Sequence, residues 1–65
     1  MKIAVNGEQL EAQAENLAAL LVELEYDPVL IATAVNEAFV RAKDRENVSL
    51  SDGDRVEIVS PRQGG

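Results

Sequence analysis

The chain of 65 residues has no cysteine, no histidine and no tryptophan. Without cysteine it can form neither a disulfide framework nor a thiolate metal site, which fits a reducing, cytoplasmic compartment. The usual pairs of a nucleophile and a general base are also missing, so we do not expect catalysis by this chain alone. No apolar run approaches the roughly 20 residues of a membrane span, and the first ten residues lack the apolar region of a signal peptide.

Basic side chains are scarce. Six Lys and Arg residues stand against twelve Asp and Glu residues, which gives a formal net charge of -6. A surface of this sign repels phosphate backbones, so we expect no nucleic-acid partner. Three basic residues, Arg41, Lys43 and Arg45, lie close together, but Asp44 and Glu46 alternate with them. We interpret this stretch as a solvated loop of mixed charge.

Alternating apolar and polar residues predict five strands, over residues 1–5, 8–12, 31–35, 38–41 and 55–60. Asn6-Gly7 predicts a tight hairpin between the first two, because both positions tolerate positive φ. The second strand is the more polar one, with Leu10 and Ala12 inward, and suits a sheet edge. In the last strand Val56 and Ile58 are expected to point inward.

One helix of about ten residues is predicted, because four leucines share one face at the spacing i, i+3, i+4, i+7: Leu17, Leu20, Leu21 and Leu24. Asn16 is its expected N-cap, and Asp27-Pro28 is its expected end. Residues 42–50 are expected to be irregular, with Val48 and Leu50 as apolar anchors.

These elements predict an α+β fold in which a mixed sheet of about five strands packs one face on the single helix. The pattern favours a β-grasp roll with the first and last strands adjacent. Residues 1–60 would form this one domain, and residues 61–65 would form a flexible C-terminal tail that ends in Gly-Gly.

The spacing of the carboxylates predicts neither an acid–base pair nor a metal site. Asp52 and Asp54 flank Gly53 in a predicted turn, so we interpret them as structural rather than as a general acid and base. A metal site built from Asp52, Asp54 and Glu57 lacks the loop pattern of a calcium-binding hand. No bound metal is therefore expected.

The tail, Pro61-Arg62-Gln63-Gly64-Gly65, offers more. Five extended residues reach roughly 17 Å, at about 3.3–3.6 Å each. Two residues without a Cβ can enter a slot too narrow for any other pair. The reactive group is the α-carboxylate of Gly65. Once a partner couples it to AMP, a sulfur nucleophile can attack to give a thiocarboxylate, or an amine can attack to give a conjugate.

Three stretches resemble the ThiS family of thiamine-biosynthesis sulfur carriers: MKIAVNGE at the start, AVN in the third predicted strand, and DGDRVEIVSPRQGG at the end. The resemblance spans the whole chain and implies a ubiquitin-like β-grasp fold. It also implies a terminal Gly-Gly that is adenylated and then thiocarboxylated. Residue by residue, it assigns the reactive carboxyl to Gly65 and the threading of the tail to Gly64, Gln63 and Arg62.

The resemblance also implies partners. An E1-like adenylating enzyme of the ThiF type would use ATP to activate Gly65, and a sulfur donor protein would supply the sulfur. A thiazole synthase of the ThiG type would receive it for the thiazole ring of thiamine. The chain departs from the family after its third strand, where Asn36-Glu37 lacks the usual glycine and the proline that follows.

Other functions stay open at this point. The chain could carry sulfur for another pathway, like the small subunit of molybdopterin synthase, or act as a protein-conjugating modifier. It could also be a β-grasp interaction module in which the two glycines are inert. Deleting the glycines would abolish carrier function and leave an interaction module intact.

Strand alternation further predicts a docking patch. If Val56 and Ile58 face the helix, then Val59 faces outward. If Val35 and Val40 face inward, then Ala34 and Phe39 face outward, and a β-grasp sheet brings these strands together. Exposed apolar patches commonly mark interaction sites. We therefore expect these three residues to seat the chain on its enzymes. The alternative is that Phe39 lies in the core and Val40 lies outside.

Overall fold

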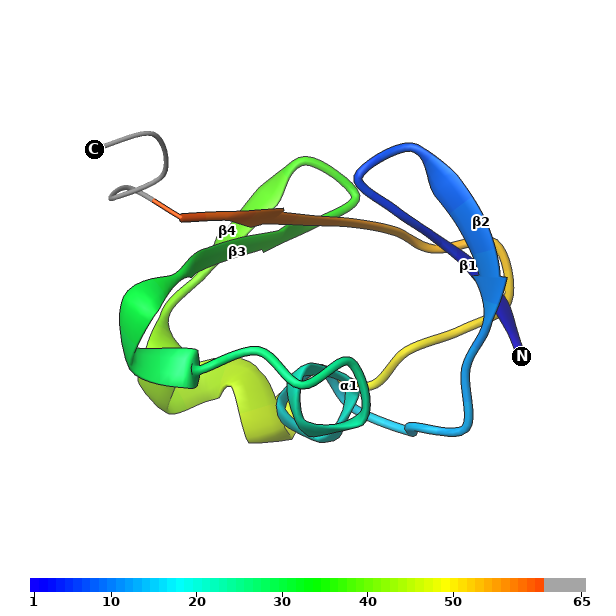
Figure 1. The fold of residues 1–65 in the computed structure, drawn as a ribbon. Coiled ribbons are helices and arrows are strands. Elements are labelled where there is room, and N and C mark those ends of the chain that lie inside the picture. The colour runs from blue at the N-terminus through cyan, green and yellow to red at the C-terminus, as the bar shows by residue number, and fades with distance from the viewer. Residues whose placement is uncertain (61–65) are drawn as a thin grey trace.

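The computed structural model describes residues 1–60 (Figure 1). The α-helix is α1 (Leu17–Glu23), the two 3₁₀ helices are η1 (Pro28–Leu30) and η2 (Ala42–Asn47), and the strands are β1 (Lys2–Val5), β2 (Glu8–Glu11), β3 (Ala32–Val35), β4 (Ala38–Val40) and β5 (Arg55–Val59). All five strands form one sheet in the order β2-β1-β5-β3-β4. The helical elements lie on one face of it, and no described element covers the other (Figure 1).

The last strand lies at the centre of the sheet. β5 pairs parallel with β1 and antiparallel with β3, while the hairpins β1–β2 and β3–β4 flank it. The predicted adjacency of the first and last strands is therefore confirmed, as is the position of β2 at an edge. Within residues 1–60, no helix is long and apolar enough to cross a membrane.

The core lies between the sheet and α1. Its fully buried aliphatic side chains come from β1, α1 and β5: Ile3, Leu17, Leu20, Leu21 and Val56. Strand residues that point the other way are partly or fully exposed, which is the expected consequence of a two-residue period. Leu50 is buried and Val48 packs against this core, so both predicted anchors are confirmed.

The helix begins as predicted and ends early. The Asn16 side chain accepts a hydrogen bond from the Ala19 amide at 2.8 Å, which confirms the N-cap. At the other end Glu25 has φ 66, and the Tyr26 amide donates to Leu21 O at 2.9 Å. This reversal stops α1 before Asp27. The prediction that Asp27-Pro28 ends the helix is wrong, because the pair begins η1 instead.

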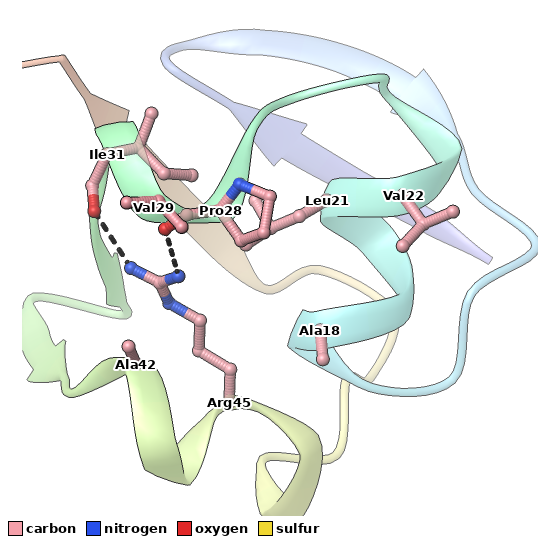
Figure 2. Close-up of a pocket in the computed structure, with 8 residues that line it drawn as sticks. All are labelled: Ala18, Leu21, Val22, Pro28, Val29, Ile31, Ala42 and Arg45. Carbon is pink, nitrogen blue, oxygen red and sulfur yellow. Dashed lines mark hydrogen bonds between the residues drawn. The ribbon is translucent and has the colours of Figure 1, made fainter.

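Residues 42–47 correct another prediction. They form η2 rather than an irregular loop, and Arg45 is buried, with only 4% of its surface exposed. Its guanidinium donates to the carbonyls of Pro28 and Ile31, both at 2.9 Å (Figure 2). It also donates to the Thr33 hydroxyl at 3.1 Å. These acceptors replace water, so the cation is held inside the fold and joins η2 to η1.

Candidate functional site

The predicted reactive segment lies beyond the described residues. Gly65, Gly64, Gln63 and Arg62 are among residues 61–65, so their predicted roles stay predictions. The structure does define the root from which the segment starts, at Val59 and Ser60. β5 is the central strand of the sheet and stays paired with β3 as far as Val59, so the root continues from a strand that the sheet holds in place.

The Asn6 side chain extends the pairing of β5 toward the root. The regular register between β1 and β5 includes only Ala4 with Arg55 and Val5 with Val56. Beyond it, Asn6 Oδ1 accepts from the Ile58 amide at 2.8 Å, and Asn6 Nδ2 donates to Ile58 O at 3.1 Å. One side-chain amide thus makes the two hydrogen bonds to β5 that a further backbone residue of β1 would otherwise make.

Asn36 holds the other end of β5 in a similar way. Its backbone amide donates to Arg55 O at 2.7 Å, and its Oδ1 accepts from the Arg55 amide at 2.9 Å. Its Nδ2 donates to Asp54 Oδ1 at 3.0 Å. The two hairpin turns therefore clamp the central strand through their asparagines.

Both turns require left-handed backbone. Asn6 and Gly7 have φ 53 and 86, as their sequence predicts. Asn36 and Glu37 have φ 51 and 74. Glu37 thus occupies, with a side chain, the turn position that Gly7 has in the first hairpin. The altered hairpin keeps the turn geometry and carries the strain of a Cβ at positive φ.

The predicted patch residues lie together on the uncovered face of the sheet. Phe39 is opposite Ala34 in the β3–β4 register, and Val59 is opposite Ala32 in the β3–β5 register. Phe39 is 70% exposed and Val59 58%. Val40 is buried, so the alternative with Phe39 in the core is wrong.

Sequence reasoning missed some neighbours on this face. Ala32 adds to the apolar surface between the flanking strands, and Glu57, directly opposite Ala34, places a carboxylate beside it. Strand alternation identified Glu57 as outward but could not give its cross-strand partner. The patch is therefore apolar with an acidic border.

The turn carboxylates serve the backbone. Asp52 accepts from the Lys2 amide at 2.7 Å, and Asp54 accepts from the Ser51 amide at 2.8 Å. Among residues 1–60 no group of three or more candidate ligands could hold a metal ion. These contacts support the structural interpretation of both residues.

Among residues 1–60 one titratable group has a clearly shifted pKa, and it lies away from the root. The Met1 ammonium lies 2.7 Å from a Glu11 carboxylate oxygen, and this hydrogen bond raises the pKa of the amino terminus. The pair joins the ends of β1 and β2 that are remote from their shared turn. It therefore fastens an edge hairpin and adds no charge to the root.

Comparison with known proteins points to one family. A model of the ThiS family matches residues 1–65. The crystal structure of a thiamine biosynthesis protein (ThiS) from Geobacter metallireducens is similar over 100% of both chains, with 26% identity and a TM-score of 0.85. A solution structure of a thiamine biosynthesis protein from the same organism has 23% identity and a TM-score of 0.81, and the match covers 100% of this chain and 88% of that one. These structures confirm the β-grasp fold. None of the curated proteins matches the chain.

Proposed function

Because the chain belongs to the ThiS family, we propose that it carries sulfur for thiazole formation in thiamine biosynthesis. The carrying group is the C-terminal carboxyl of Gly65, converted to a thiocarboxylate. The observation that supports this proposal most is a Gly64-Gly65 end placed six residues after β5, the strand held on both sides in the sheet. A rigid strand followed by two residues without side chains suits the delivery of one sulfur atom into a partner's active site.

The chemistry needs an activating partner. A carboxylate is a poor electrophile, so Gly65 first attacks the α-phosphate of ATP on an adenylating enzyme, and pyrophosphate leaves. A hydrosulfide ion released by a donor protein then attacks the acyl-adenylate carbonyl, AMP leaves with the bonding electrons, and loss of the S–H proton gives the thiocarboxylate. The chain has no histidine or cysteine with which to perform either step. We therefore propose that it is a co-substrate of these enzymes and not an enzyme itself.

The uncovered sheet face supplies the docking surface in this proposal. Phe39, Ala34 and Val59 would contact the adenylating enzyme and, in turn, the thiazole synthase. The reactive carbonyl would lie up to about 17 Å from the root at Ser60, the reach of five extended residues. Such a separation lets the sheet bind outside an active site while Gly64-Gly65 enters it.

Reconstitution tests the proposal. The chain is incubated with ATP, a cognate adenylating enzyme and a sulfur donor, and its intact mass is measured. We expect one oxygen to be replaced by sulfur, and fragmentation to place the change on Gly65. A variant without Gly65 should remain folded by circular dichroism and remain unmodified.

Two results would contradict it. Sulfur found on another residue would show that the tail is not the carrier. If the adenylating enzyme is active on a control carrier and still leaves the mass of this chain unchanged, that result would favour the interaction module.

A further inference from the structure

A hollow lies on the helical side of the molecule, on the other face of the sheet from Phe39. A cavity of about 530 Å³ opens between α1, η1 and η2 (Figure 2). Its wall includes Ala18 and Leu21 from α1, Pro28 and Val29 from η1, and Ala42 and Arg45 from η2. The volume falls within the range of about 300–1,000 Å³ that is typical of ligand pockets.

The cavity combines apolar walls with one buried cation. Arg45 donates three hydrogen bonds, all to uncharged oxygens: the carbonyls of Pro28 and Ile31 and the Thr33 hydroxyl. Within residues 1–60 no carboxylate forms an ion pair with it. A guanidinium has five N–H donors, so two of them have no acceptor within residues 1–60. The positive charge of Arg45 is therefore solvated by dipoles but not neutralised, so it can attract an anion.

The surroundings of the cavity indicate a polypeptide rather than a small molecule. Val22 and Val29 line the cavity and remain 76% and 85% exposed. A small ligand inside would leave these side chains in water, whereas a peptide could cover them together. Large exposed apolar side chains gathered at one place are typical of protein contact surfaces.

Charge complementarity identifies the partner further. The chain has a net charge of -6, and half of its six basic residues lie at Arg41, Lys43 and Arg45, on or beside η2. Arg41 is paired with Asp44 at 2.9 Å. Asp44 and Glu46 lie in the same stretch, so three basic residues against two carboxylates leave residues 41–46 with one net positive charge. A carboxylate that reaches the cavity therefore meets a net positive stretch of an acidic chain, with Arg45 as the cation at the cavity wall.

We propose that this hollow, the Arg45 cavity, binds an aliphatic segment of a partner polypeptide that carries a carboxylate. The aliphatic side chains lie between α1 and η1, and the carboxylate accepts from the two remaining N–H groups of Arg45. This site is independent of the proposed sulfur transfer. The cavity is lined by the helical elements, which lie on one face of the sheet (Figure 1), and the Phe39 patch lies on the other face, so both surfaces can be occupied at once.

The test is an NMR titration of the full chain with two matched probes. Acetyl-Leu-Leu with a free carboxylate carries both required groups, and acetyl-Leu-Leu-amide lacks only the charge. We expect saturable amide shifts at Ala18, Val29 and Ala42, and an affinity about tenfold higher for the acid, because hydrogen bonds to a charged group are the stronger ones.

Substitutions at exposed positions locate the site without disturbing the core. Val29→Glu places a competing carboxylate at the rim, and it should weaken binding of the acid at least fivefold. Val59→Glu makes the same change on the other face, and it should leave the affinity unchanged. Both variants are checked for an intact fold by their amide spectra.

Four outcomes would overturn the proposal. Equal affinity for the acid and the amide would remove the role of Arg45. Shifts centred on Phe39, or equal weakening by both variants, would place the binding elsewhere. The absence of saturable shifts with either probe up to its solubility limit would show that the cavity does not take this class of ligand.

Discussion

Truncation of Phe39 separates partner binding from folding. A fully buried aromatic side chain covers about 150–250 Å². Phe39 is 70% exposed, so about 100–175 Å² of it is available to a partner. At about 25 cal/mol per Å², covering this area is worth roughly 2.5–4 kcal/mol. Since about 1.4 kcal/mol is a factor of ten, Phe39→Ala should weaken binding to the adenylating enzyme by more than tenfold.

The same exposure limits the effect on stability. The ring lies on the uncovered face, opposite Ala34, and the core side of β4 is filled by Val40. By the same conversion, the buried remainder of about 45–75 Å² is worth only about 1–2 kcal/mol. Thermal unfolding followed by circular dichroism should therefore show a modest drop in Tm, about 4–8 °C for each kcal/mol in a domain of this size.

Calorimetric titration of the folded variant with the adenylating enzyme measures the affinity. Phe39→Leu is the matched control, because it keeps an apolar side chain at the same position, and it should lose much less. A large drop in Tm together with unchanged affinity of the folded fraction would refute the reasoning. That result would mean that the ring supports the fold and that no partner covers it.

Two further predictions concern the backbone. Glu25→Gly should raise the free energy of unfolding by about 1 kcal/mol in urea denaturation, because glycine fits the left-handed helix end at φ 66; Glu25→Gln keeps the Cβ, and an equal gain there would point to charge instead. Asn6→Asp should lower it by about 1–3 kcal/mol, because a carboxylate cannot donate to Ile58 O; hydrogen exchange should quicken at the Ile58 amide, and unchanged protection would refute the clamp.

Local patterns in the sequence were enough for the architecture. Alternation along Lys2–Val5 and Arg55–Val59 set which side chains face the core, because neighbouring side chains on a strand point to opposite faces. The leucine stripe placed α1, and Asn6-Gly7 placed the first turn, because few residues tolerate positive φ. The outward position of Phe39 followed from the same alternation, before any contact was known.

Contacts between distant segments decided the rest. The sequence around Arg45 alternates in charge and predicts solvent, yet the carbonyls of Pro28 and Ile31 bury it. The side chain of Asn6 pairs with Ile58, 52 positions away, which no local pattern indicates. The helix ends before Asp27 because the backbone reverses at Glu25, which has a positive φ. Glutamate has no intrinsic preference for that conformation, so the residue type did not predict the reversal. Buried backbone N–H and C=O groups must form hydrogen bonds. Their partners can be far away in the sequence, and only the tertiary fold brings the two groups within hydrogen-bonding distance.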